Sequence, residues 1–113
     1  MIIYKIFRAA EWDALCAAGQ TAGAPVDLAD GYIHFSTAEQ VRETAAKHFA
    51  GAGGLVLVQL DSDRLGDALK WEPSRGGALF PHLYRVLRRD EVLRHDPLPI
   101  GPDGAHVFPD ALP

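Results

Sequence analysis

Two short stretches of the chain concentrate side chains that can bind a ligand or transfer a proton. The first, GYIHFSTAEQV at 31–41, alternates apolar and hydrogen-bonding residues. The hydrogen-bonding residues at alternate positions are Tyr32, His34 and Ser36. A period of two places this phenol, imidazole and hydroxyl on one face of a strand. Ile33 and Phe35 then point to the opposite face, where we expect the core.

The same stretch also has the pattern of a helix start. Thr37 is followed three residues later by Gln40, and Ser36 is followed three residues later by Glu39. Either pair fits a capping box. We therefore predict a helix from Thr37 to about Phe49, capped by one hydroxyl, with the other hydroxyl left for a ligand. The N–H groups at such a helix start favour an anion such as phosphate.

The second stretch, KWEPSRGGALFPHLYR, is rich in ionisable and aromatic residues. Its candidate ligand-binding residues are Glu72, Arg75, His82 and Tyr84. On a strand, Trp71 and Glu72 face opposite ways, and we expect Trp71 to be the core residue. The glycine pair after Arg75 permits an unusual turn or a close approach to a ligand. The alternative interpretation is a solvated glutamate, a glycine hairpin and an aromatic pair in a minor core.

Several familiar kinds of site are not indicated. The order and spacing of His34, Glu72 and His82 match no standard zinc pattern, so no metal is expected. The chain has no G-x-S-x-G elbow, no G-x-G-x-x-G turn and no Walker P-loop. The motifs therefore favour neither a metalloenzyme nor a serine hydrolase.

The elements that must position these residues follow from hydrophobic periodicity. Strands are predicted at 2–7, 31–35, 55–60, 68–72, 80–87 and 92–98, helices at 9–18 and 37–49, and a loop at 19–30. Helices come early and strands cluster late, which indicates an α+β domain with two main helices and a sheet of five to six strands. We predict one globular domain at 1–96 and a Pro-rich tail at 97–113, extended or weakly ordered.

Charge and composition narrow the class of partner. The formal net charge of −4 argues against a large nucleic-acid interface. No segment has the apolar length of a membrane span, and the start MIIYKIF does not have the features of a signal peptide. The single cysteine, Cys16, permits no intrachain disulfide. These observations favour a cytoplasmic protein that binds a small molecule, and its oligomeric state stays open.

Four motifs, in this order, carry a resemblance to a known family. They are GYIHFSTAEQV, LVLVQLD, LKWEPSRGG and FPHLYR. The chain resembles, over about positions 2–95, the small bacterial family known as domain of unknown function 952. Members of that family typically show YHI near the start and GFIHLS at the junction. Here Lys5 replaces the histidine and Phe35 replaces the leucine.

The resemblance implies a fold and a chemistry. It implies an ADP-ribosyltransferase-like fold, which is a mixed split sheet with an NAD-binding cleft. Within that superfamily the motifs are similar to those of RNA 2'-phosphotransferases, in which H-x-H-L-S precedes a helix and an apolar strand ends in Asp. His34, Ser36 and the run ending at Asp61 match that pattern.

The implied reaction is cleavage of the nicotinamide glycosidic bond of NAD. The implied catalytic residues are Glu72 and His34, with Glu72 stabilising positive charge on the ribose. The implied cofactor-binding residues are Lys5, Tyr32, Ser36, Thr37, Arg75, His82 and Tyr84. A charged Lys5 can contact a phosphate but cannot accept a hydrogen bond as a neutral histidine can.

Two alternatives of other classes remain. One is a noncatalytic module that binds a nucleotide or phosphate in a degenerate cleft. The other is processing of a 2'-phosphate at an RNA end. Likeness of fold does not by itself decide among them.

Overall fold

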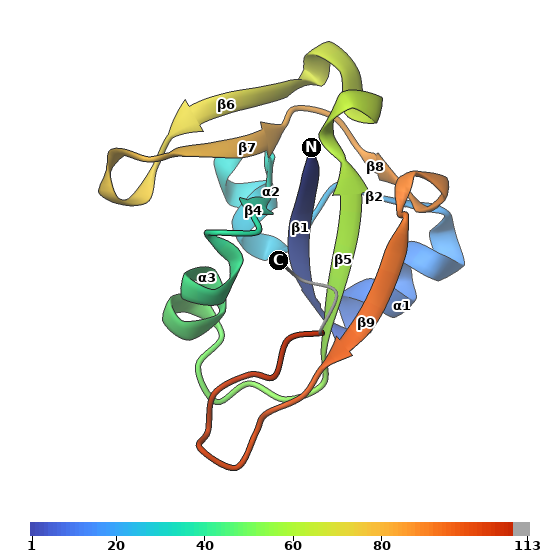
Figure 1. The fold of residues 1–113 in the computed structure, drawn as a ribbon. Coiled ribbons are helices and arrows are strands. Elements are labelled where there is room, and N and C mark those ends of the chain that lie inside the picture. The colour runs from blue at the N-terminus through green and yellow to red at the C-terminus, as the bar shows by residue number, and fades with distance from the viewer. Residues whose placement is uncertain (110–113) are drawn as a thin grey trace.

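The strands of the described residues form three small antiparallel sheets. The computed structural model describes residues 1–109, apart from the side chain of Arg75. The largest sheet has the order β4-β1-β5-β9, made by Ser36–Thr37, Ile2–Arg8, Leu55–Asp61 and Arg94–Leu98 (Figure 1). A second sheet has the order β3-β7-β6, made by Ile33–His34, Leu79–Leu83 and Leu69–Pro73. The third pairs β2, Gln20–Thr21, with β8, Leu87–Arg88.

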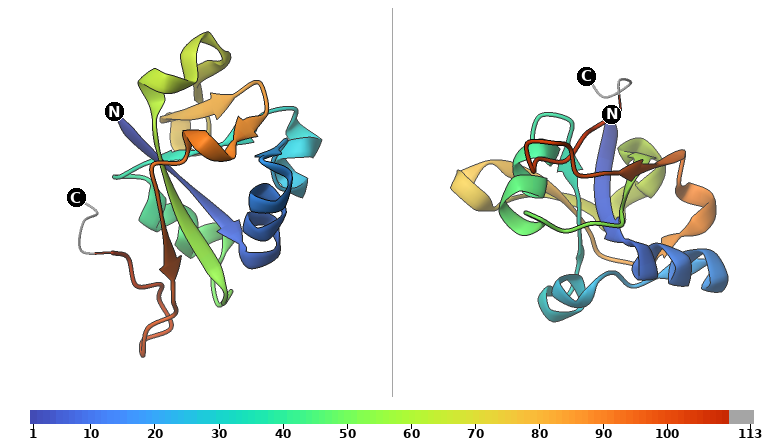
Figure 2. Two further views of the ribbon diagram at one scale, coloured as in Figure 1. Left: turned by 90° about the vertical axis from the view of Figure 1, so that its right-hand side faces the viewer. Right: turned by 90° about the horizontal axis from the view of Figure 1, so that it is seen from below.

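Helices cover both faces of the largest sheet. The α-helices are α1, Ala9–Ala18, α2, Pro25–Asp30, and α3, Val41–His48. Short 3₁₀ helices occupy Ser62–Ala68, Arg75–Gly77 and Arg89–Glu91. The views in Figure 2 show α1 and α3 on opposite sides of the sheet. The prediction of a single α+β domain is confirmed.

Two hydrophobic cores lie on the two sides of β1. Ile3 and Phe7 point to one side, where they pack with Trp12 of α1. Tyr4 and Ile6 point to the other side, where the second core includes residues of α3. The alternation is the period of two that a strand imposes. Lys5 consequently sits on the same face as Ile3 and Phe7, with its side chain only 6% exposed.

Strand β5 is buried on both faces, as its unbroken apolar run predicts. Leu57 and Val58 are both fully buried, and they belong to different cores. β1 pairs with β5 along its whole length, from Ile2 opposite Asp61 to Arg8 opposite Leu55. This pair forms the middle of the largest sheet, with β4 on one side and β9 on the other.

The chain crosses from the three-stranded sheet to the four-stranded sheet between residues 33 and 37. β3 pairs with β7, with His34 opposite His82. The N–H of Phe35 then donates to the carbonyl of Pro81 at 3.0 Å. One residue later, Ser36 of β4 lies opposite Tyr4 of β1. Side chains from both sheets therefore lie close together at residues 33–37.

Two predicted boundaries in this region are wrong. Helix α3 begins at Val41 and not at Thr37, because Thr37 still pairs with β1. The N–H of Thr37 does donate to Oε1 of Gln40 at 3.0 Å, which is one half of the expected capping box. Residues 19–30, predicted as a loop, contain β2 and α2.

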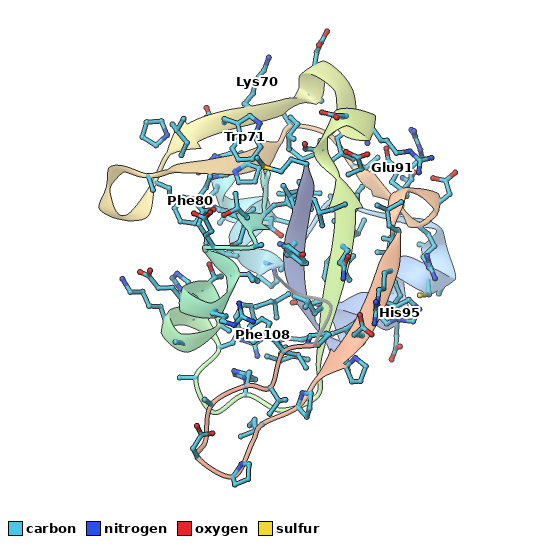
Figure 3. All side chains as sticks on the ribbon, in the orientation of Figure 1. Lys70, Trp71, Phe80, Glu91, His95 and Phe108 are labelled. Carbon is cyan, nitrogen blue, oxygen red and sulfur yellow. The ribbon has the colours of Figure 1, made fainter. Side chains whose placement is uncertain are left out.

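The expected core position of Trp71 is also wrong. Trp71 is 39% exposed, and Leu79 on the neighbouring strand is 52% exposed. β6 is the edge strand of its sheet, and the β6–β7 hairpin projects beyond the body of the molecule (Figure 1). No core lies under its tip, so the apolar face there meets solvent. Lys70, on the adjacent position, extends away from the molecule (Figure 3).

Beyond residue 96, strand β9 continues to Leu98, which is fully buried. Ile100 then forms an isolated bridge with His106, whose Nε2 lies 2.8 Å from the carbonyl oxygen of Ala52. Phe108 packs against the core on the α3 side (Figure 3). The end of the predicted tail, residues 110–113, lies outside the described residues.

Candidate functional site

A cleft of about 830 Å³ lies at the crossing between the two sheets. Its volume falls within the range of small-molecule sites. Of the residues predicted as a site, the ones that line this cleft are Lys5, His34, Ser36 and His82. They come from β1, β3, β4 and β7, so the fold brings together segments that are far apart in the sequence.

The floor of the cleft is organised around a buried carboxylate, Asp27 of α2. Its Oδ2 lies 2.9 Å from Nζ of Lys5 and accepts from the N–H of Ala24 at 2.7 Å. Its Oδ1 accepts from the N–H of His34 at 3.0 Å and lies 2.6 Å from Nδ1 of the same residue. The Asp27 side chain is fully buried. One carboxylate therefore ties α2, β1 and β3 together.

The pKa values of Asp27 and Lys5 depend on each other. Burial raises the pKa of Asp27, but the hydrogen bonds from His34 and the charge of Lys5 outweigh it and bring the pKa down to about 2. Burial lowers the pKa of Lys5, and the charge of Asp27 offsets only part of that effect. Lys5 also donates to the carbonyl of His34 at 3.0 Å. Its ammonium group is thus held by protein groups on two sides.

Both ring nitrogens of His34 face carboxylates. Nδ1 lies 2.6 Å from Asp27, and Nε2 lies 2.9 Å from Oδ2 of Asp30. The Asp30 side chain is 44% exposed, so this second contact lies at the cleft surface. His34 is therefore oriented by α2 rather than free to turn.

Behind the cleft wall, four aromatic rings form a cluster that holds His82. Tyr32 stacks on His82, with ring centroids 4.2 Å apart and an angle of 21° between the planes. Tyr32 also contacts His34 at 4.6 Å and Tyr84 at 5.2 Å between centroids. The imidazole of His82 is thereby held in one plane, at the edge of the cleft.

Glu72 joins this cluster without lining the cleft. Its Oε1 accepts from the hydroxyl of Tyr84 at 2.6 Å and lies 2.9 Å from Nδ1 of His82. The hydrogen bond from Tyr84, followed by that from His82, lowers the pKa of Glu72. The same bond raises the pKa of Tyr84 to about 12. Glu72 is an ionised acceptor at neutral pH, and it contacts His82, which lines the cleft.

The remaining predicted residues lie in different settings. Ser36 lines the cleft, and its hydroxyl lies 2.9 Å from the hydroxyl of Thr44. Thr37 and Tyr32 do not line it, although Tyr32 contacts two residues that do. Arg75 has its backbone in the 3₁₀ turn after β6, and its side chain lies outside the described part of the structure.

Sequence reasoning missed most of the residues that line the cleft, among them three charged ones, Asp27, Asp30 and Arg8. Asp27 and Asp30 lie in the segment predicted as a loop, and Arg8 is the last residue of β1. A signal for α2 was present, because Pro25 stands at its first position and Gly31 ends it in the left-handed conformation. No local signal, however, joins Asp27 to Lys5, which is 22 positions earlier.

The described residues contain no group of three or more His, Cys, Asp or Glu residues placed to hold a metal ion. Among the same residues, none of the helices combines the length and the apolar character that crossing a membrane requires.

Comparison with known proteins finds similar chains. The family described as "Protein of unknown function (DUF952)" matches residues 6–95. The crystal structure of protein CC0527 from Caulobacter crescentus is 53% identical with a TM-score of 0.94, covering 99% of this chain and 98% of that one. The solution NMR structure of CC0527 is 55% identical with a TM-score of 0.84, covering 92% and 90%. No curated protein matches the chain.

Proposed function

Since the chain belongs to the DUF952 family of proteins of unknown function, we propose that its cleft binds NAD or ADP-ribose and cleaves the nicotinamide glycosidic bond. The ligand class comes from the motifs, which resemble those of ADP-ribosyltransferase-like proteins. One observation supports this cleft as the binding site. Four residues that the motifs implicate, Lys5, His34, Ser36 and His82, line the same cleft of about 830 Å³. Such a cleft is large enough for a nucleotide.

In this proposal a carboxylate of α2 stabilises the charge that develops during the reaction. When the bond between ribose and nicotinamide breaks, the electron pair leaves with nicotinamide and positive charge develops on the ribose; a water molecule then adds to C1 of the ribose and loses a proton to solvent, which gives ADP-ribose. A fixed carboxylate stabilises such charge. Asp30 lines the cleft and is partly exposed, whereas Glu72 does not line it. In this proposal Asp30 meets the developing charge, and Glu72 is a positioning residue that orients His82.

The pyrophosphate of the proposed ligand requires a cationic side chain that is not already paired with a protein group. Lys5 is held by Asp27 and by the carbonyl of His34. Arg8 lines the cleft at its rim, with its guanidinium 5.1 Å from the ring centroid of Phe49. A guanidinium pairs well with a pyrophosphate. Arg8 is therefore assigned the role that the motif assigns to Lys5.

One observation favours the noncatalytic alternative. The ring nitrogens of His34 and the ammonium of Lys5 are held by carboxylates and a carbonyl. A cleft with these groups committed binds a ligand without transferring protons through them. Measuring nicotinamide release from NAD separates the two functions, because a binding module releases none.

Binding itself is tested by thermal denaturation with NAD, ADP-ribose and nicotinamide. A ligand at 100 times its dissociation constant stabilises the protein by about 2.7 kcal/mol, or roughly 10 °C in Tm for a domain of this size. Ala24 lines the cleft, so Ala24→Phe fills part of it and should abolish the shift.

The matched control is Ala22→Phe. Ala22 is exposed, lies two residues before Ala24, and does not line the cleft. The control should keep the ligand-induced shift. The proposal is rejected if none of the three compounds raises Tm, or if both variants respond as the wild type does.

A further inference from the structure

The imidazole of His82 has one nitrogen held and one unpaired. Its side chain is 3% exposed, and Nδ1 lies 2.9 Å from Oε1 of Glu72. Nε2 is closed off from solvent and has no hydrogen-bond partner among the described residues. Buried polar atoms are nearly always paired, so an unpaired one calls for an explanation. His34, on the paired strand position, has both nitrogens occupied.

The partner of Nδ1 decides what Nε2 can do. The carboxylate of Glu72, which also accepts from the hydroxyl of Tyr84, can only accept hydrogen bonds while ionised. Nδ1 therefore carries the hydrogen, and Nε2 of the neutral ring is an acceptor. The ring cannot easily turn to exchange the two nitrogens, because Tyr32 stacks on it at 4.2 Å.

The lining of the cleft indicates which side of the His82 ring is available to a ligand. His82 lines the cleft, whereas Glu72, Tyr32 and Tyr84 do not. Nδ1 is taken up by Glu72, which does not line the cleft, so the side of the ring that carries Nε2 is the one left to contribute to the cleft wall. The atom has almost no accessible surface, so the proposal requires the cleft wall to move when a ligand binds.

We propose that Nε2 of His82 accepts a hydrogen bond from a ribose hydroxyl of the bound ligand. This inference rests on the proposed function, which supplies the nucleotide. Ionised phosphate oxygens are acceptors and cannot pair with Nε2, whereas sugar hydroxyls are donors. A cleft that presents a buried acceptor rejects an analogue without the matching hydroxyl, because the acceptor is then left unpaired. His82 thus makes the cleft selective for a ribose over a deoxyribose.

The test compares ADP-ribose with monodeoxy ADP-riboses, each without one ribose hydroxyl. We expect one of them to bind the wild-type protein about tenfold more weakly. His82→Asn keeps a donor at the Nδ1 position toward Glu72 and removes Nε2. It should bind ADP-ribose about tenfold more weakly and no longer distinguish the two ligands. His82→Gln places a polar atom at the Nε2 position and should retain part of the selectivity.

A second measurement does not depend on the folding of any variant. The ¹⁵N resonances of the wild-type His82 ring should show a protonated Nδ1, and addition of ADP-ribose should move the Nε2 resonance. Absence of ADP-ribose binding to the wild type overturns this inference together with the proposed function. Binding with full selectivity in His82→Asn, or with an unmoved Nε2 resonance, overturns this inference alone.

Discussion

Asp27 is the residue on which most of the site depends. It is fully buried, and it contacts the ammonium of Lys5, the imidazole and N–H of His34, and the N–H of Ala24. A buried charge is tolerated only when it is paired and hydrogen-bonded. Asp27 and Lys5 satisfy that condition for each other, so neither can be changed alone without leaving the other uncompensated.

The first residue-scale prediction is that Asp27→Asn destabilises the protein by about 3–5 kcal/mol. The substitution leaves the Lys5 ammonium buried without a counter-charge while it changes the side-chain volume very little. Urea denaturation at pH 7 measures the loss in free energy of unfolding.

The control is Asp30→Asn, which removes a neighbouring carboxylate that is 44% exposed. It should cost less than about 1 kcal/mol, since exposed ion pairs contribute little. Equal destabilisation by the two substitutions would show that the Lys5–Asp27 pair is not the decisive feature.

Among individual residues, the sequence indicated side chains that meet within one stretch, and it missed side chains that come together from distant segments. Glu72, His82 and Tyr84 were expected among the ligand-binding residues of one stretch, and the structure brings all three into contact. Asp27 was not singled out, because its partners Lys5 and His34 come from other segments. An ion pair of this kind leaves no spacing signal along the chain.

At the scale of elements, α2 has to approach the cleft closely, and Gly23 permits that approach. Gly23 has φ +112°, which L-residues rarely adopt. A Cβ added there would lie 2.5 Å from Cβ of Asp27 and 2.6 Å from its Oδ2. The segment before α2 therefore requires glycine for two independent reasons.

We predict that Gly23→Ala destabilises the protein by about 2–3 kcal/mol and weakens ligand binding. The backbone strain and the displacement of Asp27 both contribute. Gly31→Ala is the control, because Gly31 also has positive φ, at +86°, but a Cβ there meets nothing within 4 Å. It should cost about 1 kcal/mol and leave binding unchanged. Identical effects on binding would contradict this account.

The errors in element boundaries share a physical cause. Thr37 had the pattern of a helix cap, but pairing with β1 prevailed, and α3 begins only at Val41. Trp71 had the pattern of a core residue, but the hairpin extends beyond the core. Local preference is a weak prior that tertiary contacts override. The buried run of β5 was predicted correctly because its burial on both faces leaves no competing interpretation.

At the scale of the whole molecule, the carboxylates with lowered pKa values make folding depend on pH. The pKa of Asp27 is about 2 in the folded protein against an ordinary 3.8. The pKa values of Glu91, bonded to Arg85, and of Glu72 are also lowered. The unfolded chain binds protons at these groups more readily. Their contribution is complete above about pH 5 and is lost as the pH falls through 4 toward 2.

We predict that the free energy of unfolding falls steadily below pH 4, with about 2 kcal/mol of the loss coming from Asp27. Urea denaturation at a series of pH values between 7 and 2 measures it. In Asp27→Asn the decline between pH 4 and 2 should be shallower, because that group no longer titrates. A decline of the same steepness in both proteins would assign the acid sensitivity to other carboxylates.

The two tryptophans lie in separate parts of the molecule and in opposite surroundings. Trp12 is 8% exposed, with the ring of His95 at 4.7 Å and the guanidinium of Arg89 at 4.9 Å. Trp71 is 39% exposed on β6, next to Glu72. The chain therefore carries two native fluorophores, a shielded one that follows the central sheet and a quencher-accessible one beside the residue that holds His82. Movement of the hairpin and melting of the core can be read as two distinct optical signals from one unlabelled protein.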